Sequence, residues 1–152
     1  MDRVKVAAQA ESRADPATVF RLLKDGSTWT DWAKFDSFEL ERPGQQETYG
    51  VGAIRVLSSK LTRAREEIVE VVPDRRVSYV LLSGLPLRAY HAEVELASAA
   101  NGGTVIRWRA AFYPQHVVMG WFWRRFMTWV LATLVRRLAL AAERLRTSER
   151  TT

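Results

Sequence analysis

The chain has 152 residues and a formal net charge of +6, with 47% of its residues hydrophobic and 26% charged. This length and composition favour one globular domain and exclude wholesale disorder. The sequence has no cysteine, which excludes disulfide frameworks, thiol nucleophiles and zinc sites built on thiolates.

The first part of the chain predicts a strand and two short helices. Apolar and polar residues alternate over positions 3–12, as in a half-buried β-strand. Asp15 and Pro16 are typical of a helix start, because aspartate can cap the first turn and proline there loses no needed hydrogen bond. This helix should end at Asp25, and a second short helical stretch should follow at residues 29–32.

The middle of the chain is predicted to consist mostly of strands. Six further runs have strand character, at residues 38–41, 50–57, 66–72, 77–82, 90–96 and 104–113. Short turns separate most of them, and the Asn-Gly-Gly sequence at 101–103 is a strong hairpin signal. Strands joined by short turns imply an antiparallel sheet, here of about seven strands in all.

The last predicted element is one long helix over residues 115–147, followed by a short polar tail at 148–152. Apolar residues recur at steps of three and four from Met119 to Leu145, which forms a continuous apolar stripe. The helix must bury this stripe, and the sheet is the large partner available. The sequence therefore predicts an α+β fold.

Most of the positive charge lies in this helix and its tail. Residues 117–152 hold seven arginines and two glutamates, so they carry +5 of the net +6. This distribution does not favour a nucleic-acid-binding domain, and we expect no nucleic-acid partner. Residues 117–135 have the length of a membrane span, but Arg124 and Arg125 at the centre would each cost about 2.5–3.5 kcal/mol there. We therefore predict an amphipathic helix.

Several short segments, taken in order, are similar to those of one known family. They are Ala14–Phe20, Trp29–Trp32, Gly50–Gly52 with Arg55, Glu66–Tyr79, and Gly102–Thr104 with Trp108. Their order resembles the helix-grip fold of the START-like (SRPBCC) superfamily, and more closely its polyketide cyclase/dehydrase branch. The resemblance covers nearly the whole chain. It implies one domain over residues 1–147, with a seven-stranded curved antiparallel sheet wrapped around the long C-terminal helix. It implies no particular reaction.

A curved sheet that grips a helix leaves space between the two, and the apolar member of each alternating pair should face that space. Such a pocket with a few tyrosine hydroxyls would suit a lipid-like or aromatic ligand. Each candidate could instead be an ordinary core residue. The expected ligand-binding residues are Trp29, Trp32, Phe35, Tyr79, Leu81, Tyr90, Val94, Trp108, Phe112, Trp123 and Phe126.

Candidates for catalysis come from the resemblance. In cyclase members of the family, a pocket arginine and a tyrosine are thought to orient the polyketide, which here indicates Arg55 with Tyr79 or Tyr90. The pattern does not determine which face of the sheet Arg55 occupies. A salt bridge on the outer face is the alternative, since a buried arginine needs an acidic partner or a ligand.

The other titratable residues are interpreted as surface groups. Glu66, Glu67 and Glu70 are expected on a solvated strand face, opposite basic residues of neighbouring strands. His91 should lie on the outer face, and His116 at the entrance of the long helix. Two distant histidines without cysteine make a metal site improbable, and no motif indicates a cofactor.

These observations lead to one main hypothesis and two alternatives. The main hypothesis is a protein that binds a hydrophobic small molecule, as a carrier or a sensor. The first alternative is a polyketide cyclase/aromatase-like enzyme. The second is peripheral membrane or partner binding through the basic amphipathic helix, where Trp121, Phe122 and Trp129 flank the apolar stripe. These aromatic residues could instead pack on loops or on a second subunit of a homodimer.

Residues 1–11 lack a long apolar run, and we expect a cytoplasmic protein.

Overall fold

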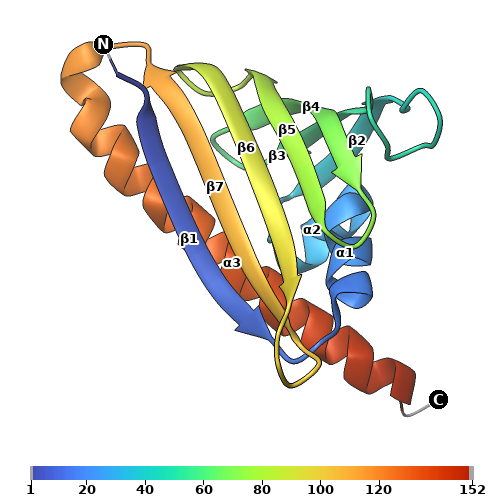
Figure 1. Ribbon diagram of the computed structural model, residues 1–152. Coiled ribbons are helices and arrows are strands. Elements are labelled where there is room, and N and C mark those ends of the chain that lie inside the picture. Colours follow the sequence, from blue (N-terminus) through green and yellow to red (C-terminus); the bar gives the residue numbers. More distant parts are fainter. Residues whose placement is uncertain (1, 151–152) are drawn as a thin grey trace.

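The computed structural model describes residues 2–150, which form one antiparallel sheet, one long helix and two short helices (Figure 1). The strands are β1 (Val4–Ser12), β2 (Ser37–Arg42), β3 (Ile54–Ser58), β4 (Arg63–Val72), β5 (Arg76–Ser83), β6 (Leu87–Ser98) and β7 (Thr104–Pro114). The helices are α1 (Pro16–Lys24), α2 (Trp29–Trp32) and α3 (Gly120–Arg150), with 3-10 turns at Gly26–Thr28 and Val117–Met119. The strand order is β1-β7-β6-β5-β4-β3-β2. The predicted α+β helix-grip fold is confirmed.

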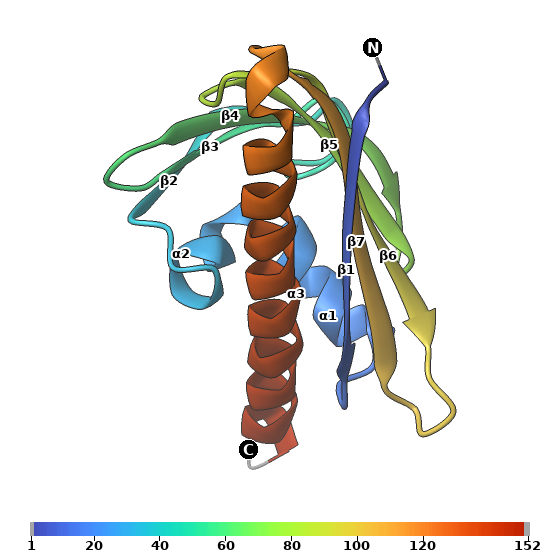
Figure 2. The same ribbon diagram turned by 90° about the vertical axis from the view of Figure 1, so that its left-hand side faces the viewer.

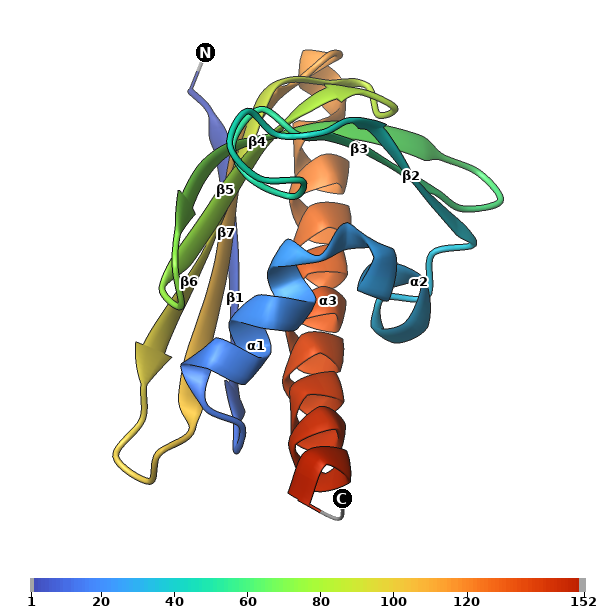
Figure 3. The same cartoon turned by 90° about the vertical axis from the view of Figure 1, so that its right-hand side faces the viewer.

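The sheet curves around α3. Figures 2 and 3 show α3 running along the concave side of the sheet, with α1 and α2 beside it. Hydrogen bonds join its C-terminal half to the end of β1 and to the residue after it. The Ser12 hydroxyl donates to the Ala139 carbonyl at 2.8 Å, and the Arg13 amide donates to the Glu143 carboxylate at 2.9 Å. These contacts hold the helix along the first strand.

The alternation that predicts the inner face of the sheet is confirmed in β6 and β7. Tyr90, Ala92, Val94 and Leu96 are buried, whereas His91 between them is exposed. The apolar set of β7 is buried too, comprising Thr104, Ile106, Trp108, Ala110 and Phe112. The hairpin between the two strands turns at Gly102, which has a φ of +85° that suits glycine. Cross-strand packing on this inner face builds the core.

Two predicted elements differ from the structure. The strand expected at residues 50–57 starts only at Ile54, because residues 50–53 form a turn in which Gly52 has a φ of +92°. The helix expected at 115–147 starts at Gly120, after a 3-10 turn, and continues to Arg150. It therefore includes the first three residues of the expected polar tail, whose last two residues lie outside the described part of the chain.

Within residues 2–150, no helix combines the length and the apolar character that crossing a bilayer requires. In α3, the arginine pair near the N-terminal end is exposed. The prediction that the apolar segment 117–135 belongs to an amphipathic helix agrees with this finding.

Candidate functional site

A cavity of about 170 Å³ lies between the N-terminal half of α3 and strands β4, β5 and β6. Its wall is formed by Trp29, Phe35, Thr62, Ala64, Glu66, Tyr79, Leu81, Leu85, Tyr90, Phe126, Met127, Val130, Leu131 and Leu134. An apolar cavity of about 150 Å³ is large enough for benzene, whereas sites for drug-sized ligands have about 300–1,000 Å³. The cavity as it stands therefore suits one or two fused rings.

The polar residues of this wall include one carboxylate, Glu66. Glu66 lies on β4 directly opposite Arg55 of β3 in the antiparallel register. The Arg55 Nε donates to the Glu66 Oε1 at 3.1 Å, and the two residues are only 2% and 8% exposed. The pair is therefore a buried salt bridge with one direct hydrogen bond, which is a weak arrangement for stability.

The guanidinium of Arg55 lies behind the cavity wall, between two aromatic rings. Its Cζ is 4.2 Å from the centroid of Trp29 and 5.1 Å from that of Tyr79, which are cation–π distances. Among the described residues, no hydrogen-bond acceptor reaches its Nη1 or Nη2. A buried guanidinium with two unsatisfied nitrogen atoms is costly, and each such case requires a reason.

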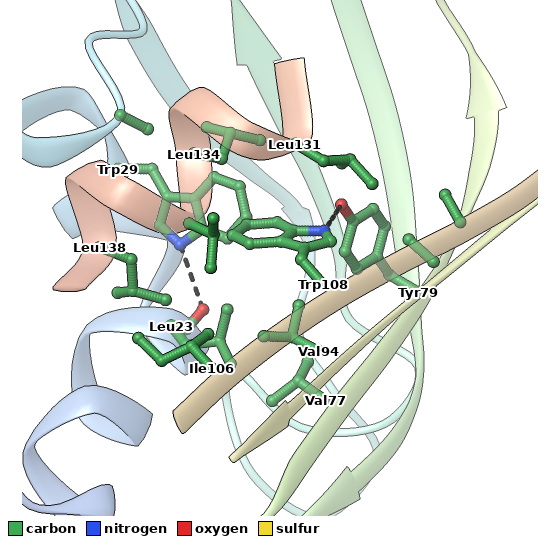
Figure 4. Close-up of a cluster of buried hydrophobic side chains, with 14 of the residues drawn as sticks. Leu23, Trp29, Val77, Tyr79, Val94, Ile106, Trp108, Leu131, Leu134 and Leu138 are labelled. Atoms are coloured by element: carbon green, nitrogen blue, oxygen red, sulfur yellow. Dashed lines mark hydrogen bonds between the residues drawn. The ribbon is translucent and has the colours of Figure 1, made fainter. Parts of the chain in front are cut away.

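The tyrosine hydroxyls form the second polar feature of the wall. The indole of Trp108 donates to the Tyr79 hydroxyl at 3.2 Å, as Figure 4 shows. Burial raises the pKa of Tyr79 well above its usual value, with further contributions from Tyr90 and Glu66. Burial also raises the pKa of Tyr90, and the nearby Glu66 adds to the effect. Both hydroxyls therefore stay protonated, and because they are hydrogen-bonded to each other, one proton remains free to donate to a ligand.

The environment of Glu66 acts on its pKa in two directions. Burial raises the pKa of the Glu66 carboxyl, while the charge and the hydrogen bond of Arg55 oppose this shift. A carboxyl group with a raised pKa in a cavity is a candidate for acid–base chemistry. Arg55, Glu66, Tyr79, Tyr90 and Trp108 together are called the buried polar cluster below.

Beyond this cluster, the space between the sheet and α3 is tightly filled. Trp29 packs edge-on against Trp108, with ring centroids 5.7 Å apart, and its indole donates to the Leu23 carbonyl at 3.1 Å. Figure 4 shows Leu138 and Ile106 beside these rings. Trp29, which also lines the cavity, therefore lies between the cavity and the filled part of the core.

The structure places the predicted ligand-binding residues in two groups. Six of them lie in the cavity wall, namely Trp29, Phe35, Tyr79, Leu81, Tyr90 and Phe126. The other five lie outside it, namely Trp32, Val94, Trp108, Phe112 and Trp123. Phe112, for example, is buried behind Tyr90, on which it stacks with ring centroids 5.8 Å apart.

The structure corrects the interpretation of Glu66 as part of a solvated strand face. Glu66 points inward with Ala64 and Ile68, its neighbours two positions away, and only Glu67 and Glu70 are left more exposed. Strand alternation from the apolar Ile68 could have indicated this position. Charge alone is a poor guide to the face that these carboxylates occupy, because a buried arginine lies opposite Glu66. Arg55, whose face the sequence left open, is inside.

Other wall residues were not expected from the sequence as site residues. Met127, Leu131 and Leu134 come from the apolar side of α3, and Thr62 and Leu85 come from the ends of two hairpins. Periodicity identifies the apolar side of a helix, but it does not distinguish a cavity wall from ordinary core. Within residues 2–150, no group of three metal-ligating side chains comes together.

Three comparisons relate the chain to known proteins. Residues 3–143 match the family described as "Polyketide cyclase / dehydrase and lipid transport". Among the curated proteins searched, none matches. Solved structures share the fold at low identity. A START superfamily protein from Mycobacterium smegmatis has a TM-score of 0.80 at 12% identity, and the alignment covers 93% of this chain and 98% of that one.

Two further structures have a similar overlap. The protein XoxI from Bacillus cereus has a TM-score of 0.74 at 17% identity, and 96% of this chain and 99% of that chain are aligned. A protein from Nitrosospira multiformis has a TM-score of 0.73 at 18% identity, with 90% and 94% aligned. Likeness at these identities concerns the fold alone. The family match, which spans most of the sequence, carries the assignment.

Proposed function

The chain belongs to the polyketide cyclase/dehydrase and lipid transport family of START-like proteins, and from this premise we propose that it binds a hydrophobic small molecule in the cavity beside α3. The ligand is a compact aromatic compound or a part of a larger lipid-like molecule that carries one oxygen group. It is held as cargo or as a signal. The cytoplasmic location stays a prediction.

One observation carries this proposal. The cavity wall is apolar over α3 and most of the strands, but Glu66, Tyr79 and Tyr90 place three polar side chains within it. Ligand sites combine these two features, because apolar walls supply affinity and a few polar groups set orientation. A merely imperfect core would not be expected to keep a carboxylate and two hydroxyls around an empty space.

The buried polar cluster indicates which ligand group is recognised. Arg55 bonds one oxygen of Glu66 and so holds the carboxylate in place. The Tyr79 hydroxyl accepts from Trp108 and is hydrogen-bonded to the Tyr90 hydroxyl, so the two tyrosines together have one proton free to donate. Glu66 can accept a hydrogen bond, and the tyrosines can donate one. A phenol or an enol, which both donates and accepts, fits this combination.

Tryptophan fluorescence titration tests the proposal, because Trp29 lies in the wall. Naphthalene and 2-naphthol are suitable probes of the expected size. We expect both to quench the fluorescence of the native protein saturably. Replacing Ala64 of the wall by phenylalanine should fill the cavity and abolish the quenching. The matched control is Ala97→Phe, on the exposed side of β6. The absence of saturable binding by either probe, or equal binding by both variants, would refute the proposal.

A second candidate function rests on the place of Glu66 in the cavity wall, where burial raises the pKa of its carboxyl. As a base, Glu66 would take a proton from the carbon between two carbonyl groups of a polyketide. The resulting carbanion would attack another carbonyl of the same molecule, the alkoxide would take the proton back, and loss of water would follow. A general base acts best with a pKa near the working pH.

This cyclase-like reaction has a separate test. A linear polyketide mimic is incubated with the native protein and with the Glu66→Gln variant, and cyclised product is measured by mass spectrometry. The enzymatic alternative predicts product that depends on Glu66. Binding without any product formation would exclude it for that substrate class and leave the binding proposal intact.

A further inference from the structure

The N-terminal part of α3 and the turn before it expose an unusual number of large apolar side chains. Trp121 and Trp129 are 65% and 63% exposed, and Val118 is 80% exposed. Large exposed apolar patches mark interaction sites in proteins that are otherwise well packed. The aromatic patch, as it is called below, comprises Val117, Val118, Trp121, Phe122, Phe126 and Trp129.

The rings of the patch contact one another along the helix surface. Phe122 and Phe126 stack in parallel with centroids 5.9 Å apart, and Phe126 also lies 6.2 Å from Trp129. Within residues 120–130, Met127 is the one helix residue that the structure buries. This part of α3 therefore turns a continuous aromatic surface to the solvent.

The charge of the patch restricts its partner. Arg124 and Arg125 are exposed, and neither has an ion-pair partner within the described residues. Arg125 is four residues from both Trp121 and Trp129, so it lies between them on the helix surface. The sequence has no acidic residue between 115 and 142. A second copy of the chain on a two-fold axis would bring arginine against arginine, whereas an anionic surface complements the patch.

The patch is continuous with the cavity. Phe126 belongs to both, because it is 38% exposed and lies in the cavity wall. Thr62 of the wall follows Leu61, which is 95% exposed in the β3–β4 turn beside Lys60. Figure 2 shows this turn and the N-terminal half of α3 at the same end of the molecule. Apolar and basic residues therefore occur together at the rim of the cavity.

We propose that the aromatic patch docks the protein on an anionic lipid bilayer, with α3 lying on the surface. Tryptophan prefers the membrane–water interface, and arginine binds lipid phosphates through several donors. A basic amphipathic helix with aromatic residues is typical of interfacial binding. Docking on the bilayer does not depend on the proposed ligand. Docking would bring the cavity rim to a membrane that holds hydrophobic molecules, and this role rests on the proposed function.

Vesicle co-sedimentation tests the docking. The native protein is mixed with vesicles of phosphatidylcholine alone or of equal parts phosphatidylcholine and phosphatidylglycerol. We expect binding to the anionic vesicles at low salt, and a large loss of binding at about 1 M salt, where the screening length falls to about 3 Å. The Trp121→Ala/Trp129→Ala variant should bind at least about tenfold more weakly, because two interfacial anchors are lost.

The control variant is Leu140→Ala, which removes an exposed apolar residue of the C-terminal half of α3 and should leave binding unchanged. Circular dichroism checks that each variant is folded. The Ala64→Phe variant should lose naphthol binding and keep vesicle binding, which separates a failure of docking from a failure of the cavity. Three results would overturn the proposal: no binding to anionic vesicles at low salt, equal binding by the double tryptophan variant, or a concentration-dependent dimer in solution that the same variant abolishes.

Discussion

Two parts of α3 have different surroundings, although they belong to one uninterrupted helix. The C-terminal part, from Leu131 onward, packs on β1 and α1 and buries a dense set of apolar residues between Leu131 and Ala142. The N-terminal part, residues 120–130, buries only Met127, borders the cavity and exposes Trp121 and Trp129. One end of the helix therefore holds the fold together, and the other end is available for binding.

This division explains how the fold carries a cavity without losing stability. Burial of apolar surface at the C-terminal end supplies stabilisation at about 25 cal/mol per Å². The region around the N-terminal end of α3 has three features that do not favour the stability of the fold. These are an incompletely filled core, a buried salt bridge with unsatisfied nitrogen atoms, and exposed aromatic rings.

The largest expected effect is a difference in unfolding free energy between a variant in the packed part of α3 and one in its exposed part. Leu138 is fully buried, and Leu138→Ala should lower the free energy of unfolding by about 2–5 kcal/mol, because it leaves a cavity in a packed region. Trp129→Ala removes a larger but exposed side chain and should change it by about 0.5 kcal/mol or less. Urea denaturation measures both. Similar losses of unfolding free energy for the two variants would contradict the division of α3 into a packed part and an exposed part.

The next effect concerns the salt bridge at the cavity. Replacing both partners, as in Arg55→Met/Glu66→Leu, removes two buried charges and two unsatisfied nitrogen atoms at once. The free energy of unfolding should stay unchanged or rise by up to about 4 kcal/mol, as when other buried ion pairs are replaced by apolar residues. A clear loss of stability in the double variant would show that the pair serves the fold rather than the ligand.

A smaller effect is a pH dependence that the double variant lacks. Burial raises the folded-state pKa of Glu66 above its ordinary value of 4.5, so the folded protein binds a proton more tightly than the unfolded chain. The stability that Glu66 contributes is therefore fully present below that ordinary pKa and is lost as the pH rises through the folded-state pKa. Relative to the double variant, the native protein should become less stable with rising pH. The opposite slope in urea titrations would mean that Arg55 outweighs burial.

Sequence reasoning predicts the architecture well, because periodicity reports what a whole element does. The alternation of β6 and β7 correctly places Tyr90 and Trp108 inside, and the long stripe correctly predicts α3. The ends of strands and helices are harder to predict where the backbone is irregular. The turn at residues 50–53 looks like strand in sequence, but Gly52 adopts a left-handed conformation there.

The candidate site was harder to predict, because it depends on departures from the usual pattern. Arg55 and Glu66 are charged residues on an inner face, and only their cross-strand pairing makes that position possible. The sequence also does not show which apolar residues surround a cavity. Trp108 and Phe112 fit the inward pattern as well as Tyr79 does, but they lie outside the wall.

The most direct test of the account compares the affinities of naphthalene and 2-naphthol for the native protein and for the Arg55→Met/Glu66→Leu variant. The native protein should prefer 2-naphthol by about five- to tenfold, which corresponds to one net hydrogen bond. The variant should bind naphthalene at least as well and show a clearly smaller preference for 2-naphthol, because residue 66 no longer accepts a hydrogen bond from its hydroxyl. An undiminished preference for 2-naphthol in a folded variant would contradict the assignment of the buried polar cluster to ligand recognition.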